Sequence, residues 1–213
     1  MGMSKWLCHG RWWLILWTFL PLMGVVAGET EPPERVMFEA PRVGTQTVWR
    51  LVDQSGERSV THTVLDDVSD FDGRPVFRES NGRVTQVFNA VNNNWIATLD
   101  NRGEVTLSAE PDTGTYNWPL WVGKQWLASY RYTDHEQQKS INPVVRNWKV
   151  VAYESVTVPA GTFDAFVIEG TPVSDQSWKR SLWFVPQLGT HVRHVQQRAE
   201  QTAVAELILI TRP

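Results

Sequence analysis

The chain has 213 residues, with 20 Lys and Arg against 23 Asp and Glu, and a single cysteine, Cys8. This mildly acidic balance argues against nucleic-acid binding, which depends on cations that neutralise phosphates. One cysteine excludes a disulfide framework and a thiolate metal site, so we expect an ordinary hydrophobic core to stabilise the protein.

Residues 1–27 have the layout of a secretory signal peptide. Two basic residues precede an apolar run that begins at Trp12, and small residues follow up to Ala27. The run covers about 16 residues and contains Pro21, whereas a membrane-spanning helix needs roughly 20 apolar residues without a break. We therefore predict a periplasmic or secreted protein with no transmembrane segment in the mature chain. A retained membrane anchor is the alternative.

The rest of the chain alternates apolar and polar residues over short runs separated by turn residues, the pattern of antiparallel β-strands. We expect a flexible segment over residues 28–41 and a single all-β domain over residues 42–213. Five or six strands are expected in the first half and six in the second. The candidate strands cover residues 47–53, 59–68, 75–80, 83–91, 94–100, 103–109, 125–133, 147–158, 163–173, 178–185, 190–198 and 203–212. The last segment lacks helix breakers, but Ile208 and Ile210 favour a closing strand over a helix.

The stretch SVTVPAGTFDAFVIEG, residues 155–170, is the most regular hairpin signal in the chain. Proline presets φ at the second position of a type I turn, and glycine is favoured at the fourth. The sequence therefore predicts a tight turn over Val158–Gly161 between two strands.

A Val-Gly-x-Gln echo occurs at residues 43–46 and 122–125. If it is a repeat, the domain consists of two related meanders, residues 42–117 and 118–213; a chance match is the alternative. The turn-rich stretch at residues 109–124 is expected to be a connection inside one domain.

Motifs that would indicate catalysis or metal binding are absent from the sequence. His191 and His194 are an odd number of positions apart, so on a regular strand they face opposite sides and cannot share a metal without a bulge. No serine lies in a Gly-x-Ser-x-Gly or Ser-x-x-Lys motif. We predict no catalytic residue, no metal site and no cofactor. A hydrolase that uses paired carboxylates is kept as an alternative, because such pairs leave no sequence spacing to recognise. The available carboxylates are Asp66, Glu79, Glu154 and Glu169.

Tryptophan is the compositional exception. The chain has 12 tryptophans, and 8 remain when the four within residues 1–27 are subtracted. Such rings, flat and with one polar N–H, can line an apolar cavity or form a stacking surface, and they can also fill the core of a curved sheet. The candidate ligand-binding residues are Trp118, Trp121, Trp126, Trp148 and Trp178.

Three motifs follow one another between residues 118 and 195. They are Pro119-Leu120-x-x-Gly123-Lys124-x-Trp126, then Glu154-x-Val156-x-Val158-Pro159-Ala160-Gly161-x-Phe163, then Trp183-Phe184-x-Pro186-x-Leu188-Gly189. Together they resemble the TapB-like family of exported bacterial domains of unknown function. The resemblance implies a curled antiparallel sheet, a half-barrel or open barrel-like meander, and it carries no active site.

These observations predict a non-catalytic, monomeric protein of the cell envelope. The first hypothesis is that it binds an apolar or amphipathic ligand, such as a lipid, on the concave face of the sheet near the candidate tryptophans. The alternative is an interaction or assembly module for an envelope protein or a polysaccharide, in which exposed aromatic side chains make the contact.

Overall fold

The computed structural model describes residues 31–174 and 178–213, so the predicted signal peptide lies outside the described residues. Within these residues the chain forms twelve β-strands and one short 3-10 helix, η1. In chain order they are β1 Gln46–Asp53, β2 Gly56–Phe71, β3 Arg74–Ser80, β4 Thr85–Asn89, β5 Trp95–Leu99, β6 Val105–Glu110, β7 Gln125–Asp134, β8 Lys139–Val158, β9 Gly161–Pro172, β10 Trp178–Val185, η1 Pro186–Leu188, β11 Thr190–Arg198 and β12 Gln201–Thr211. No helix in the described part of the chain is long and apolar enough to cross a membrane.

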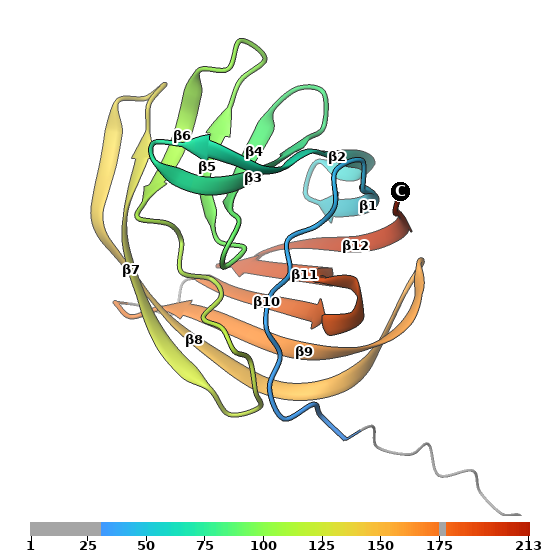
Figure 1. Cartoon of the computed structure of the whole chain (residues 1–213). Helices are drawn as coiled ribbons and strands as arrows, with labels where there is room; N and C mark the ends of the chain where they lie inside the picture. The colour runs from blue at the N-terminus through green and yellow to red at the C-terminus, as the bar shows by residue number, and fades with distance from the viewer. Residues whose placement is uncertain (1–30, 175–177) are drawn as a thin grey trace, which may run out of the picture.

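The strands form one antiparallel sheet that closes into a barrel (Figure 1). Each strand pairs with its neighbours in the sequence, and β12 also pairs with β1. At this seam Trp49 pairs with Leu207, and the Arg50 guanidinium donates to the carboxylate of Glu206, 156 positions away. The all-β prediction is confirmed. The predicted half-barrel or open sheet is wrong, because the first and last strands complete the ring.

The strand predictions agree closely with the observed elements. The largest difference is β8, which begins at Lys139 instead of residue 147. Its first five residues are all exposed, so the alternation that marks the other strands is missing there. The last segment is a strand, as predicted, and the edges of β1 and β11 both pair with it.

The predicted turn between β8 and β9 is confirmed. Val158 pairs with Gly161, and only Pro159 and Ala160 lie between them. The Ala160 N–H donates to the Leu207 carbonyl at 3.0 Å, so the turn reaches the closing strand β12. Around this contact lies a buried apolar cluster of Trp49, Val156, Val158, Ala165, Val185, Val192 and Leu207.

Both copies of the Val-Gly-x-Gln echo immediately precede a run of strands. Gly44 and Gly123 have φ values of +82° and +91°, a left-handed conformation that favours glycine, and the glutamines begin β1 and β7. The strands β1 to β6 follow the first copy, and β7 to β12 follow the second. The repeat itself stays a prediction.

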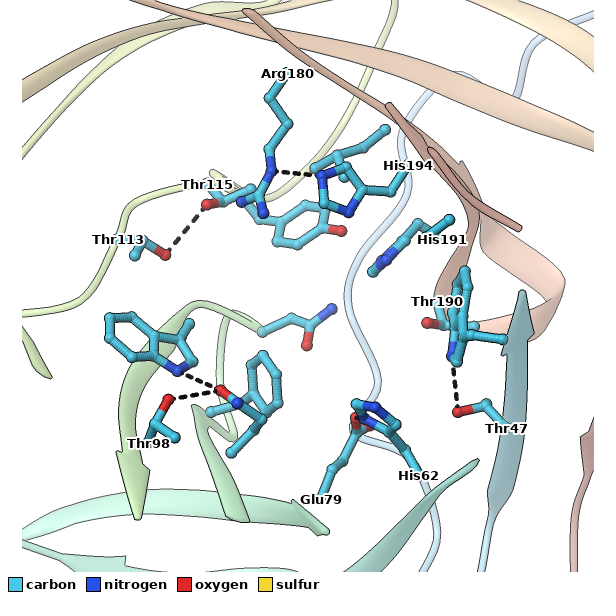
Figure 2. Close-up of a pocket in the computed structure, with 18 of the residues that line it drawn as sticks. Thr47, His62, Glu79, Thr98, Thr113, Thr115, Arg180, Thr190, His191 and His194 are labelled. Carbon is cyan, nitrogen blue, oxygen red and sulfur yellow. Dashed lines mark hydrogen bonds and ion pairs between the residues drawn. The ribbon is translucent and has the colours of Figure 1, made fainter. Parts of the chain in front are cut away.

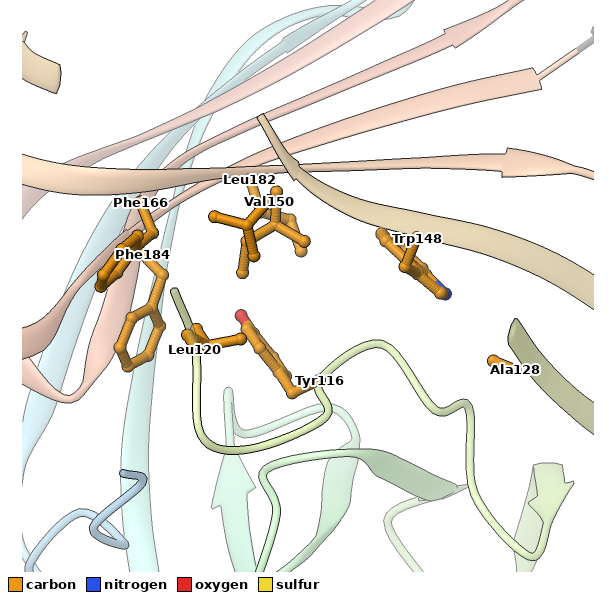
Figure 3. Close-up of a cluster of buried hydrophobic side chains, with 9 residues drawn as sticks. Tyr116, Leu120, Ala128, Trp148, Val150, Phe166, Leu182 and Phe184 are labelled. Carbon is orange, nitrogen blue, oxygen red and sulfur yellow. The ribbon is translucent and has the colours of Figure 1, made fainter. Parts of the chain in front are cut away.

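The segment between β6 and β7 packs inside the barrel (Figures 1 and 3). Its Tyr116 and Leu120 are buried against inward side chains of β8, β9 and β10. This cluster consists of Tyr116, Leu120, Ala128, Trp148, Val150, Phe166, Ile168, Leu182 and Phe184. Each large apolar side chain buried here contributes roughly 1.5–3 kcal/mol to stability. This cluster therefore fills the part of the barrel interior next to β8, β9 and β10.

Candidate ligand cavity

A cavity of about 540 Å³ occupies the part of the barrel that the 111–124 segment leaves open (Figure 2). Its walls come from β1 to β6, from β10 to β12 and from residues 113–116. The volume lies within the range of roughly 300–1,000 Å³ that is typical of small-molecule sites. A barrel of this size therefore has both a packed core and a space for a ligand.

One part of the cavity wall is apolar. Its side chains are Trp49, Leu51, Phe88, Trp95, Leu107, Leu182 and Ala205. The Trp95 Nε1–H donates to Oε1 of Gln86 at 2.7 Å, and the Thr98 hydroxyl donates to the same oxygen at 3.0 Å. Because the N–H of Trp95 has a hydrogen-bond partner, its indole is available for contact with an apolar ligand.

A second part of the wall is polar and contains Arg180 on β10. Its Nε–H donates to Nε2 of His194 at 3.0 Å, and Figure 2 shows the guanidinium directed into the cavity beside Thr115. The Thr115 hydroxyl donates to Oγ1 of Thr113 at 3.1 Å. Within the described residues Arg180 has no ion pair with a carboxylate.

A β-bulge in β11 brings two histidines to the same face. Leu182 pairs with His194 and Phe184 pairs with His191. The partners are therefore two positions apart on β10 but three apart on β11, which has one extra residue at the bulge. Both histidines consequently line the cavity, with ring centroids 6.1 Å apart. In the described part of the chain, no group of three or more His, Cys, Asp or Glu could hold a metal ion.

Burial and a neighbouring cation keep these histidines neutral. Desolvation, followed by the charge of Arg180, lowers the pKa of His191 to about 4 and the pKa of His194 to about 2. Neutral His194 can accept the hydrogen bond from Arg180, whereas imidazolium could not. Burial also raises the pKa of the Tyr116 hydroxyl, which stays protonated. At neutral pH, the positive charge on this wall therefore belongs to Arg180.

The opposite wall carries the one carboxylate among the described residues that line the cavity. His62 Nδ1 lies 3.8 Å from Oε2 of Glu79, and Figure 2 shows the pair across the cavity from Arg180. The lining is therefore polarised, with a cation at one end and a carboxylate next to a histidine at the other.

A second hollow of about 530 Å³ adjoins the first. Thr47, Glu79, Asn93 and Thr190 line both hollows. Residues within 37–42 line the second hollow but not the first. The N-terminal segment thus borders the space next to the cavity.

Four of the five candidate tryptophans belong to the core cluster or pack against it: Trp148 is a member, and Trp118, Trp126 and Trp178 pack against it. The Trp118 Nε1–H donates to the Asn92 carbonyl and the Trp126 Nε1–H to the Gly114 carbonyl, both at 2.8 Å. Trp148 is 3% exposed and stacks on Trp126 at 6.4 Å. These rings hold the 111–124 segment in place.

Trp121 and Trp178 have cations beside their rings. Trp121 is 39% exposed, and Lys124 Nζ lies 4.6 Å from its ring centroid. Trp178 has the guanidinium of Arg146 at 4.7 Å and that of Arg180 at 6.0 Å. The tryptophans that line the cavity are Trp49 and Trp95, which are not among the five candidates. Ligand binding by the five candidates stays a prediction.

One residue in the sequence could have indicated the cavity. Arg180 occupies the inward row of β10, between Trp178 and Leu182, where alternation predicts an apolar side chain. A charged residue in such a row indicates a polar site inside the barrel. The two histidines gave no such signal, because their common orientation depends on a bulge.

No protein-family model matches the chain, and no curated protein matches it significantly. Among the solved structures similar to it are the following three. A protein from Parabacteroides distasonis ATCC 8503, described as a lipoprotein, is 15% identical, with a TM-score of 0.45 over 83% of this chain and 99% of that one. A protein from Bacteroides fragilis NCTC 9343, described as exported and as having a YmcC-like fold, is 12% identical, with a TM-score of 0.46 over 83% of this chain and 100% of that one.

The third similar structure is the hypothetical lipoprotein YmcC from Escherichia coli K12. It is 10% identical, with a TM-score of 0.46 over 82% of this chain and 90% of that one. At these identities and TM-scores, the three structures carry no conclusion about the function of the chain. The resemblance to the TapB-like family, for which no family model matches, stays a prediction.

Proposed function

We propose that the protein is a non-catalytic, exported protein of the cell envelope that holds an amphipathic small molecule inside its barrel. The observation that carries this proposal is the cavity of about 540 Å³, in which an apolar wall meets a polar one. Ligand sites combine these features, because apolar side chains supply affinity while a few polar groups fix orientation. The predicted signal peptide supports export.

The composition of the lining supports binding over catalysis. Glycoside hydrolysis uses two carboxylates, and among the described residues of the lining Glu79 is the single acid. The described residues of the lining also include neither serine nor cysteine, the usual nucleophiles of acyl transfer. His194 accepts a hydrogen bond from the cation Arg180, and its ring lies edge-on to that of His191, an arrangement that suits a polar anchor.

The alternative, an interaction module with exposed aromatic side chains, has one supporting observation. Trp121 lies at the surface with Lys124 at 4.6 Å and Arg35 at 5.9 Å from its ring. Interfaces depend on clustered anchors surrounded by a rim that excludes water. A single ring between two cations is not a cluster of anchors with such a rim. The proposal therefore rests on the cavity.

Titration with N-phenyl-1-naphthylamine, a neutral dye that brightens in apolar surroundings, tests the cavity. We expect saturable binding to protein purified without detergent, and its loss in Ala205→Trp, which puts an indole into the cavity. The matched control is Ala203→Trp, at an exposed position of the same strand, which should bind as the wild type does.

Circular dichroism would establish that both variants are folded. Absence of saturable dye binding to the wild type would contradict the proposal. Undiminished binding to a folded Ala205→Trp variant would do so as well, because the dye would then occupy another part of the molecule.

A further inference from the structure

Arg180 brings a positive charge into the cavity, and none of the described residues forms an ion pair with it. Among the described residues its side chain forms a single hydrogen bond, to neutral His194. Burial lowers the pKa of its guanidinium, yet arginine stays protonated in proteins. Removing an ion from water carries a large desolvation penalty unless a counter-charge offsets it. The donors on its two terminal nitrogens are free to bind such a counter-charge.

A second arginine strengthens the positive potential in this region. Arg146 and Arg180 both contact the ring of Trp178, at 4.7 Å and 6.0 Å. Arg146 also forms no ion pair with a described residue, and its Nε is buried without a hydrogen-bond partner. Arg146 does not line the cavity. Two cations that form no ion pair with a described residue lie near one wall, and together they create a field that attracts anions.

The groups around Arg180 favour an anion over a cation. His191 and His194 are neutral, and the hydroxyl groups of Thr115 and Tyr116 line the same part of the cavity. The one acid among the described residues of the lining, Glu79, lies across the cavity beside His62 (Figure 2). It therefore does not neutralise Arg180.

We propose that the cavity selects single-chain amphiphiles with an anionic head group, a carboxylate or a phosphate, which the guanidinium of Arg180 binds. The inference rests on the proposed function of the cavity. The planar fork of an arginine matches both head groups with paired, charge-assisted hydrogen bonds. The hydrocarbon chain extends from this anchor along the wall formed by Trp49, Phe88 and Trp95.

The test is displacement of N-phenyl-1-naphthylamine by four compounds that share one hydrocarbon chain: dodecanoate, dodecyl phosphate, dodecanol and dodecyltrimethylammonium, each below its micellar concentration. In the wild type we expect at least one anion to bind roughly 10- to 100-fold more tightly than dodecanol, the range that charge-assisted hydrogen bonds supply. The anion that benefits identifies the head group. The ammonium compound should bind no better than dodecanol.

Arg180→Gln should abolish the preference for anions and leave the affinity for dodecanol within about twofold. Arg146→Gln is the matched control, because it removes an arginine that likewise forms no ion pair with a described residue but does not line the cavity, and it should keep most of the preference. Arg180→Lys preserves the charge without the fork and should keep part of the preference. If Arg180→Gln fails to fold, the lysine variant is the test. A reduced preference for anions in Arg180→Lys supports Arg180 as the anchor, and an unchanged preference contradicts it.

Several outcomes separate this inference from the proposed function. Equal binding of anions and dodecanol, tighter binding of the ammonium compound, or an equal loss in Arg146→Gln and Arg180→Gln would overturn the anion site and leave the cavity function standing. A wild-type protein that binds neither the dye nor any of the four compounds would overturn both.

Discussion

Trp148 and Gly170 are directly opposite each other in the β8–β9 pair, and the indole covers the position where a side chain would stand. A Cβ built on Gly170 would lie 2.4 Å from Cζ3 of Trp148, well inside the contact distance of two carbons. The φ of this glycine is not positive, so the reason for glycine here is space for the ring. Trp148 in turn stacks on Trp126 and meets Trp178 edge-on at 6.3 Å.

Gly170→Ala should therefore lower the free energy of unfolding by about 1–3 kcal/mol, the usual penalty for overpacking a core. Urea unfolding at equilibrium measures it. The control is the same substitution in a Trp148→Leu background, where the ring is gone and the penalty should largely disappear. A penalty of the same size in both backgrounds would show that the backbone, and not the indole, requires glycine at this position.

The cavity residues were harder to predict than the tryptophans. Composition alone drew attention to Trp118, Trp126 and Trp148, and these rings do gather in one region. The cavity, in contrast, combines side chains from nine strands, and its content depends on which face of each strand points inward. A single bulge in β11 reverses that assignment for His191 relative to His194. Without the register of the sheet, the sequence could not place them together.

Among the elements, the strands were predictable and the segments that pack inside the barrel were not. Period-two alternation identified the strands because most of them have one face toward the interior. The stretch at residues 109–124 contains many turn formers and was expected to be a simple connection. Tyr116 and Leu120 nevertheless place part of it in the core. Isolated apolar residues among turn formers have no period, so their burial depends on the tertiary structure.

The N-terminal segment is attached to this inner segment. The N–H groups of Val36 and Leu120 donate to each other's carbonyls at 3.1 Å and 2.9 Å, and Phe38 stacks on Trp118 at 5.6 Å. The prediction that residues 28–41 are flexible is not tested by these contacts. Residues 28–30 of that segment also lie outside the described residues.

Phe38→Ala tests whether the segment contributes to stability. Phe38 is half-buried and also contacts Phe77 at 6.3 Å, so we expect a loss of about 1–2 kcal/mol in the free energy of unfolding. The matched control is Met37→Ala, at a neighbouring side chain that is 66% exposed, which should change stability by less than about 0.5 kcal/mol. Equal, negligible effects in both variants would indicate a flexible segment, as the sequence predicted.

At the scale of the whole molecule, closure of the barrel is the feature that the sequence did not predict. The seam pairs β1 with β12, the first and last strands of the domain in the sequence. No local sequence pattern specifies a pairing between segments so far apart in the chain. Closure removes the exposed edges that an open sheet would leave for aggregation. It also gives the cavity a continuous wall, since β1 and β12 contribute Thr47, Trp49 and Ala205.

A closed ring should unfold as one unit, which provides a test of the prediction that residues 42–213 form a single domain. Leu207→Ala removes a fully buried side chain at the seam, and we expect it to cost about 2–5 kcal/mol. The matched control is Leu209→Ala, two positions further along β12 and beyond a register shift, where the side chain is 53% exposed and the effect should stay below about 0.5 kcal/mol.

Urea unfolding would be followed by far-ultraviolet circular dichroism and by tryptophan fluorescence. In a single cooperative domain the two signals change together, and Leu207→Ala shifts both to lower urea by the same amount. Two separate transitions, with only one moved by Leu207→Ala, would show that the two meanders unfold independently and that closure of the barrel does not couple them.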